Sequence, residues 1–294
     1  MKSLRVLITD LSPQFTSSER KIANVILADY PFTALSNIQE LAEKTGVSAP
    51  SVTRFVAKIG CEGFQDFQRQ LIAELQEGQR SPRDLVSRSV PVESEDFLAG
   101  YSKRLAAVLE ELTQTIPASQ FDLLAGLIAD PSRNIFLIGG RVSDTIAAFL
   151  SIHLRQIRSG VYHMSENPEF WPEHVLRMRK KDVVIFFDFR RYQQNLVQLA
   201  NTVAQTAQPL IILITDKWMS PIARSSTHVI ALPIDAGTAW DTMVAAIAFT
   251  EALIVKVSEG DWEATQKRIR AWDEIRLVTS PFDKAPANGE NNET

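Results

Sequence analysis

Small, polar and basic side chains recur on one side of a predicted helix over residues 48–58. An arginine can donate two parallel hydrogen bonds to guanine, and hydroxyl groups and lysine suit phosphate oxygens. No acidic side chain interrupts this surface, so we predict that it binds DNA. The predicted DNA-binding residues are Ser48, Ala49, Ser51, Thr53, Arg54 and Lys58.

The preceding residues predict the helix-turn-helix that would position this surface. Ser36 and Gln39 have the spacing of a capping box, so we expect a helix to begin at Ser36. Gly46 suits the turn because a residue without a Cβ adopts a positive φ at little cost. We expect Ser48 to cap the second helix, in which Val52 faces inward. Ordinary helical hairpins with a solvated outer face share this spacing, and that alternative remains open.

A second group of candidate residues follows two predicted buried strands. Gly139 and Gly140 end the first of these strands and precede a helix, whose N-terminus favours an anion. Arg190 and Arg191 follow another strand, and burying their charges unpaired would be costly. Either they bind an anionic ligand, or one pairs with Asp188 and both shape a dimer contact. The predicted effector-binding residues are Gly139, Gly140, Arg141, Ser143, Asp188, Arg190, Arg191 and Tyr192.

The remaining reactive residues do not indicate a metal or cofactor site. The sequence lacks the Gly-x-Gly-x-x-Gly pattern of dinucleotide sites. Cys61 is the only cysteine, which excludes an intrachain disulfide and a thiolate zinc cluster. The histidines show no metal-ligand spacing. We therefore expect no metal ion and no cofactor.

Composition is that of a globular protein with room for two domains. The chain has 294 residues, of which 45% are hydrophobic and 22% charged. Its formal net charge is −4, so any affinity for DNA must come from local basic patches. The N-terminal apolar run is too short for a signal peptide, and no apolar stretch is long enough to span a membrane. We expect a cytoplasmic protein.

A regular alternation of strands and helices defines the larger part of the chain. The continuous apolar runs that predict buried parallel strands lie at 135–138, 161–164, 183–187, 210–214 and 229–232. Helices are expected at 144–157, 169–179, 191–206, 219–225, 239–257 and 261–275. The fold class is therefore α/β, a doubly wound α/β/α domain with a five-stranded parallel sheet that follows an all-α bundle.

Breaks in this periodicity divide the chain. Gly78, Pro82 and Pro91 interrupt the helical pattern, and the last residues are polar. The predicted parts are a helix-turn-helix domain over 1–77, a linker over 78–93, an effector-binding and oligomerisation domain over 94–278, and a disordered tail over 279–294.

The chain resembles the RpiR-type transcriptional regulators, which join a helix-turn-helix to a sugar-isomerase (SIS) domain. The residues that carry the resemblance include Ile38-Gln-Glu-Leu-Ala42, Gly46-Val-Ser48, Ser51-Val-Thr-Arg-Phe55, Gly139-x-x-x-Ser143 and Asp182-Val-Val-Ile185. The resemblance implies a regulator that binds phosphosugars and acts at operators as a dimer or tetramer.

The loop after the third strand departs from this family. Members that bind phosphosugars carry Ser-x-Ser-x-x-Thr there, and this chain has Asp188, Arg190 and Gln193 at those positions. Arg141 also replaces a usual glycine of the first loop. The effector could therefore be a phosphosugar or another small anion such as a carboxylate. Alternatively, the domain has lost ligand binding and serves only for assembly, with a vestigial ligand cleft.

These observations predict a transcriptional regulator, not an enzyme. Its expected partners are a double-stranded DNA operator, a small anionic metabolite and further copies of itself, as a homodimer or homotetramer. The rival hypothesis is a sugar-phosphate isomerase with an accessory helical domain. It is disfavoured because no Glu or His stands out at the strand ends as a general base.

Overall fold

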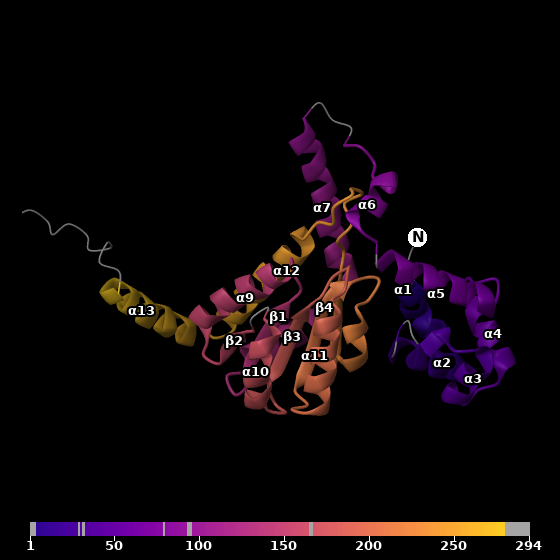
Figure 1. The fold of residues 1–294 in the computed structure, drawn as a ribbon, viewed down its shortest axis with the longest axis horizontal. Helices are drawn as coiled ribbons and strands as arrows, with labels where there is room; N and C mark the ends of the chain where they lie inside the picture. The colour runs from indigo at the N-terminus through magenta and orange to yellow at the C-terminus, as the bar shows by residue number, and fades with distance from the viewer. Residues whose placement is uncertain are drawn as a thin grey trace, which may run out of the picture.

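The computed structural model describes residues 4–28, 30, 33–78, 80–92, 96–164 and 167–279. A helical bundle formed by the N-terminal residues lies beside one end of a larger α/β part, as Figure 1 shows. The two parts correspond to the all-α bundle and the α/β/α domain that the sequence predicts. The expected fold class is confirmed.

The bundle packs short amphipathic helices around one apolar core. Phe55, Phe67 and Leu71 are fully buried in this core, at the helical spacing seen in the sequence. The helices are α1 (Leu4–Leu11), α2 (Ser17–Ala28), α3 (Ile38–Thr45), α4 (Ala49–Lys58) and α5 (Phe64–Gly78), with 3₁₀ turns η1 (Ser12–Gln14) and η2 (Thr33–Leu35).

The turn of the helix-turn-helix forms as expected, but the first cap is shifted by one residue. Asn37, not Ser36, is the N-cap of α3, and its Oδ1 accepts from the Glu40 backbone N–H at 2.9 Å. The asparagine carbonyl accepts such a bond as well as a serine hydroxyl, so the sequence offered two candidate caps. Gly46 ends α3 with φ 63°, the left-handed conformation that favours glycine.

Further helices connect the bundle to the sheet. The segment predicted as a linker contains the short helix α6 (Pro82–Leu85), which begins with a capping box between Ser81 and Asp84. The elements that follow are η3 (Val86–Arg88), α7 (Phe97–Thr115) and α8 (Ala118–Ala129).

Five parallel strands form one sheet in the order β2-β1-β3-β4-β5. Every residue of β1 and β3 is buried, which confirms strands covered on both faces. Gly139 at the end of β1 lies opposite Phe187 at the end of β3, so the loops that follow them emerge side by side. The strands are β1 (Ile135–Gly139), β2 (Val161–His163), β3 (Val183–Phe187), β4 (Leu210–Asp216) and β5 (His228–Leu232).

Helices cover both faces of the sheet. Helices α8, α9 and α12 pack on one face, and α10, α11 and η5 pack on the other. The segment 219–225, expected as an α-helix, contains instead a 3₁₀ helix that begins at Pro221. The bounds are α9 (Asp144–Ile157), η4 (Pro168–Phe170), α10 (Trp171–Arg177), α11 (Gln194–Gln205), η5 (Pro221–Ser225), α12 (Val244–Gly260) and α13 (Trp262–Thr279).

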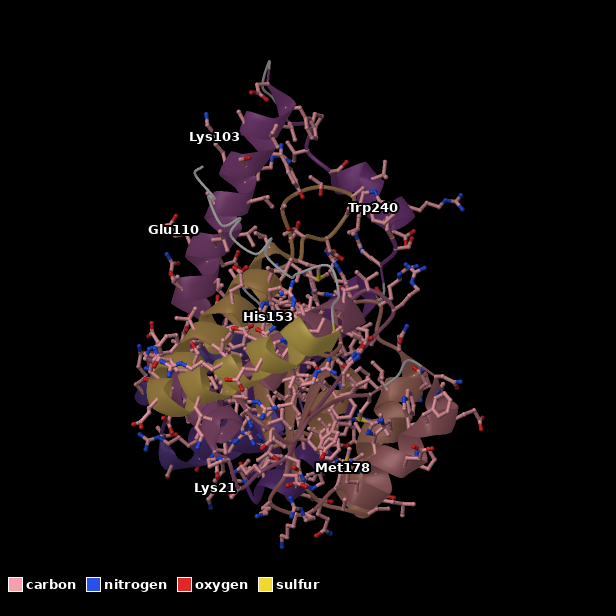
Figure 2. All side chains as sticks on the ribbon, turned by 90° about the vertical axis from the view of Figure 1, so that its left-hand side faces the viewer. Lys21, Lys103, Glu110, His153, Met178 and Trp240 are labelled. Carbon is pink, nitrogen blue, oxygen red and sulfur yellow. The ribbon has the colours of Figure 1, made fainter. Side chains whose placement is uncertain are left out.

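The last helix, α13, leaves the body of the domain (Figure 1). Viewed from that side, it crosses in front of α9, the helix that carries His153 (Figure 2). Its anchor includes a hydrogen bond from Arg268 Nε to the Arg155 carbonyl at 2.8 Å. The predicted disordered tail falls, beyond Thr279, outside the described residues. Within the described ranges, no helix has the length and apolarity needed to cross a bilayer.

Gly139 provides a test of how tightly the loop after β1 is packed. A Cβ added there would lie 2.4 Å from the backbone nitrogen of Asp144, so Gly139→Ala must displace the start of α9. We expect it to lower the free energy of unfolding by about 1–3 kcal/mol, measured by chemical denaturation.

Gly126 in α8 is the matched control. A Cβ there would meet no atom within 4 Å, so Gly126→Ala should leave stability unchanged or raise it by up to about 1 kcal/mol through helix propensity. An unchanged denaturation midpoint for Gly139→Ala would contradict the close packing of this loop.

Candidate functional site

Helix α4 presents the predicted DNA-binding surface to solvent. Val52, Phe55 and Val56 are buried in the bundle, which fixes the rotation of the helix. Ser48, Thr53, Arg54 and Lys58 are exposed, and Ala49 and Ser51 are half-buried. All six predicted residues are therefore at least partly exposed to solvent, and their contacts with DNA remain predictions.

Contacts within this face distinguish its two cations. Arg54 Nη2 donates to Ser51 Oγ at 3.2 Å, and Ser51 Oγ lies 2.9 Å from Ser48 Oγ, so the guanidinium is oriented but exposed. Lys58 Nζ instead contacts Glu19 Oε2 and the Gln14 carbonyl, each at 2.8 Å. Arg54 is thus the cation of α4 that is available to a base edge.

A pocket of about 360 Å³ opens where β1 and β3 end. In this strand order the connections run in opposite directions from β1 and β3, which is where α/β sheets commonly bind ligands. The lining residues are Gly140, Arg141, Val142, Ser143, Asp188, Phe189, Arg190, Arg191, Gln193 and Met243.

The loop between β1 and α9 is held by its own side chains. Ser143 Oγ accepts from the Gly140 backbone N–H at 2.9 Å and donates to the Phe187 carbonyl at 2.6 Å. Asp144 Oδ1 accepts from the Gly139 N–H at 2.9 Å. The Ser143 hydroxyl therefore shapes the loop and ties β1 to β3.

The three arginines of the pocket are in different states. Arg141 and Arg191 are exposed, and neither has a hydrogen bond or ion pair within the described residues. The Arg190 side chain is only 2% exposed, and both its Nε and Nη2 donate to Asp241. Its guanidinium also lies 4.1 Å from the ring centroid of Trp218. Two of the three guanidinium groups are free to meet an anion.

Two buried carboxylates hold the loop after β3. Asp188 Oδ2 accepts from Ser220 Oγ at 2.5 Å. Asp216 accepts from the Arg190 backbone N–H at 2.7 Å and from the Tyr192 hydroxyl at 2.6 Å. Burial raises the pKa of Asp188 to about 7, and the nearby Asp216 adds to this rise. Burial likewise raises the pKa of Asp216 to about 6.

The comparisons with known families agree with both halves of this geometry. Residues 2–78 match the helix-turn-helix domain of the rpiR family, and residues 128–256 match the SIS domain. The chain belongs to the RpiR-type transcriptional regulators.

Relatives of this regulator carry the same description. An HTH-type transcriptional regulator of Thermotoga maritima is 27% identical over 223 residues, 74% of this chain and 77% of the relative. The HTH-type transcriptional regulator HexR of Escherichia coli is 26% identical over 227 residues, 76% of this chain and 75% of HexR.

Solved structures share the fold. The Vibrio vulnificus NanR protein complexed with ManNAc-6P has a TM-score of 0.52 at 16% identity, over 95% of this chain and 100% of that one. The sugar isomerase domain of an RpiR transcription factor from Sphaerobacter thermophilus has a TM-score of 0.55 at 18% identity, over 60% and 98% of the two chains.

Six of the eight predicted effector residues of this RpiR-type regulator line the pocket: Gly140, Arg141, Ser143, Asp188, Arg190 and Arg191. Tyr192 lies outside the pocket lining, because its hydroxyl turns to Asp216. Gly139 is not among the lining residues either, but its N–H holds the loop through Asp144. These residues thus sit in or beside one pocket, and their ligand contacts remain predictions.

Three further residues contribute to this end of the sheet and were not predicted as site residues. Asp241, Ser220 and Met243 come from distant loops, and only the fold brings them to this end of the sheet. Ser220 alone has a local signal in the sequence, because Ser220-Pro-Ile-Ala223 also resembles the RpiR-type regulators. Among the described residues, no group of three or more His, Cys, Asp or Glu could hold a metal ion.

The buried Asp188 predicts how stability depends on pH. Its pKa near 7 in the folded protein exceeds the ordinary value of about 3.9 for the unfolded chain. The folded state therefore binds this proton more tightly, and its contribution to stability is lost as the pH rises from about 4 to 7. Asp188→Asn should reduce the loss of unfolding free energy between about pH 5 and pH 8.

Denaturant melts at both pH values would measure this difference. Asp273→Asn, at an exposed position of α13, is the control and should leave the pH dependence unchanged. An equal pH dependence in Asp188→Asn and the parent would show that this carboxyl does not titrate in the window.

The exposed position of Arg54 predicts that its substitution weakens specific DNA binding. Arg54→Ala should weaken binding to the operator by about 1–3 kcal/mol if the guanidinium pairs with one guanine. Arg83→Ala, an exposed arginine of α6, should bind normally. Fluorescence anisotropy titrations with the operator would measure both, and normal binding by Arg54→Ala would reject this contact.

Proposed function

We propose that this regulator binds operator DNA through α4 and senses a small anionic metabolite in the pocket between β1 and β3. The observation that carries the proposal is the pair of unengaged arginines, Arg141 and Arg191, at a pocket of about 360 Å³. A cavity of this size suits a metabolite. Guanidinium groups bind phosphate and carboxylate through two parallel hydrogen bonds.

The ligand class follows from the charges around the pocket. The N-termini of α9 and α11 begin at the two loops that line it, and such termini favour anions. Asp188 would repel an anion only when ionised, and its pKa of about 7 leaves it partly neutral. A phosphosugar is therefore compatible with the site, as is a sugar carboxylate of similar size. The NanR structure with ManNAc-6P supports testing phosphosugars first.

The pocket favours a regulator over an isomerase. Its lining contains no His or Glu, and its one carboxylate, Asp188, is buried against Ser220. An isomerase needs a base within reach of a substrate C–H bond. We propose that binding here is not followed by chemistry, as the relatives described as transcriptional regulators suggest.

Self-association would place two copies of α4 on successive half-sites of an operator in the cytoplasm. Helix α12 buries one side on the sheet and leaves Ile247 and Val255 exposed, at 43% and 51%. We propose a homodimer or homotetramer that uses this face. A single-subunit mass by light scattering at micromolar concentration would contradict it.

Ligand binding by the pocket can be measured as a thermal shift. ManNAc-6P, other sugar phosphates and sugar acids would be screened, because a ligand that binds only the folded state raises the melting temperature. We expect the best ligand to lose most of its shift in Arg141→Ala and in Arg191→Ala. Arg270→Ala, an exposed arginine on α13, should keep the full shift.

Two outcomes would contradict this proposal. If no anion stabilises the protein, the domain serves assembly alone. If purified protein converts a sugar phosphate into its isomer, the isomerase hypothesis is correct instead.

A further inference from the structure

The loop after β3 borders both the ligand pocket and the DNA-binding bundle. Arg190 lines the pocket on one side. On its other side, Arg190 Nη1 lies 3.8 Å from Oε1 of Glu77, near the end of α5. Helix α5 belongs to the bundle that carries the recognition helix and contacts α4 directly. A single buried side chain thus touches both functional parts of the regulator.

The surrounding contacts make this junction tight. A Cβ added at Gly78, the last residue of α5, would lie 3.1 Å from both Tyr192 and Trp218. The next residue of the same loop, Met219, is 2% exposed and packs in the core of the bundle. Arg5 Nη1 also donates to Met219 Sδ at 3.2 Å. Movement of the loops after β3 or β4 would therefore displace α5.

The hydrogen bonds of Arg190 are incomplete. Nε and Nη2 donate to Asp241, but Nη1 is buried and has no hydrogen-bond acceptor. Glu77 is too far for a hydrogen bond in this state, and its Oε2 pairs with Arg80 Nε at 2.9 Å. A buried N–H without an acceptor costs free energy, so a small shift or an incoming anion that satisfies Nη1 would be favoured.

We propose that Arg190 couples the pocket to the DNA-binding bundle through Glu77. With the pocket empty, the charge of Glu77 attracts Nη1 and holds the end of α5 against the loop. An anion in the pocket draws the Arg190 guanidinium toward itself and away from Glu77, and α5 loses this attraction. Ligand binding thereby changes the position of α4 and the affinity for the operator. This inference rests on the proposed function, because it requires an anion in the pocket.

The first test compares operator binding with and without ligand. Glu77→Gln keeps the size of the side chain and removes its charge. Anisotropy titrations with operator DNA would be run without ligand, with ManNAc-6P and with inorganic phosphate. We expect the ligand to change the operator Kd of the parent at least 5-fold. In the Glu77→Gln variant, the ligand should change the operator Kd less than 2-fold, while the thermal shift caused by the ligand persists.

The second test needs no ligand. Asp241→Asn weakens the main partner of Arg190 and should turn the guanidinium toward Glu77, which changes the operator Kd at least 3-fold. In the Glu77→Gln background, Asp241→Asn should change the operator Kd less than 1.5-fold, because the charge that attracts the guanidinium has been removed. Glu110→Gln, on the outer side of α7 (Figure 2), is the matched control.

These measurements separate the two proposals. If no ligand shifts the melting temperature, ligand sensing fails, and the double-mutant cycle still tests the link between Arg190 and Glu77. If a ligand binds but Glu77→Gln keeps the full effect of ligand on operator affinity, the inference is overturned. Additive effects of Asp241→Asn and Glu77→Gln would overturn it as well. Circular dichroism melts of each variant would exclude unfolding as the cause.

Discussion

Two buried carboxylates fix the chain where the parallel sheet ends. Asp188 follows β3, Asp216 ends β4, and both accept hydrogen bonds from the loops that continue from these strands. The C-terminal ends of parallel strands all lie at one edge of the sheet. The loops that follow them have no neighbouring strand with which to form backbone hydrogen bonds. The carboxylates accept hydrogen bonds from these loops instead, at the cost of burying two ionisable groups. The shape of the pocket depends on these hydrogen bonds.

The same arrangement explains why the pocket differs from the pattern expected for phosphosugar-binding relatives. Where those proteins offer hydroxyl groups, this chain offers a carboxyl that is bonded to Ser220 and an arginine that is paired with Asp241. The remaining positive charge is carried by Arg141 and Arg191 at the rim of the pocket. The proposed recognition of an anion therefore rests on these two guanidinium groups rather than on hydroxyl groups of the loop.

The DNA-binding helix depends on a different constraint, the packing of short helices. Helix α4 has ten residues, too few to be stable alone in water. Its orientation therefore comes from burial of Val52, Phe55 and Val56 in the bundle. The bundle in turn has Met219 of the larger domain in its core. The bundle and the α/β domain are therefore physically connected through this shared core.

Much of the fold and part of the site could be predicted from the sequence. All five strands and the fold class were predicted, because a strand buried on both faces must be continuously apolar. Gly46 was located because few other residues tolerate its positive φ. The first cap was misplaced, since Ser36 and Asn37 both have a capping side chain with a polar partner three residues later. The positions of the pocket loops were predicted because loops that follow parallel strands meet at one edge.

Only the tertiary structure decided which of the charged residues are free. Arg190 and Arg191 are adjacent and chemically equal in the sequence, yet one is buried against Asp241 and the other is exposed. Lys58 and Arg54 differ in the same way, because α2 brings Glu19 to Lys58. Periodicity is a local property that the chain encodes within a few residues. The partner of a charge can lie 51 residues away, as Asp241 does from Arg190, and is set by how the whole chain packs.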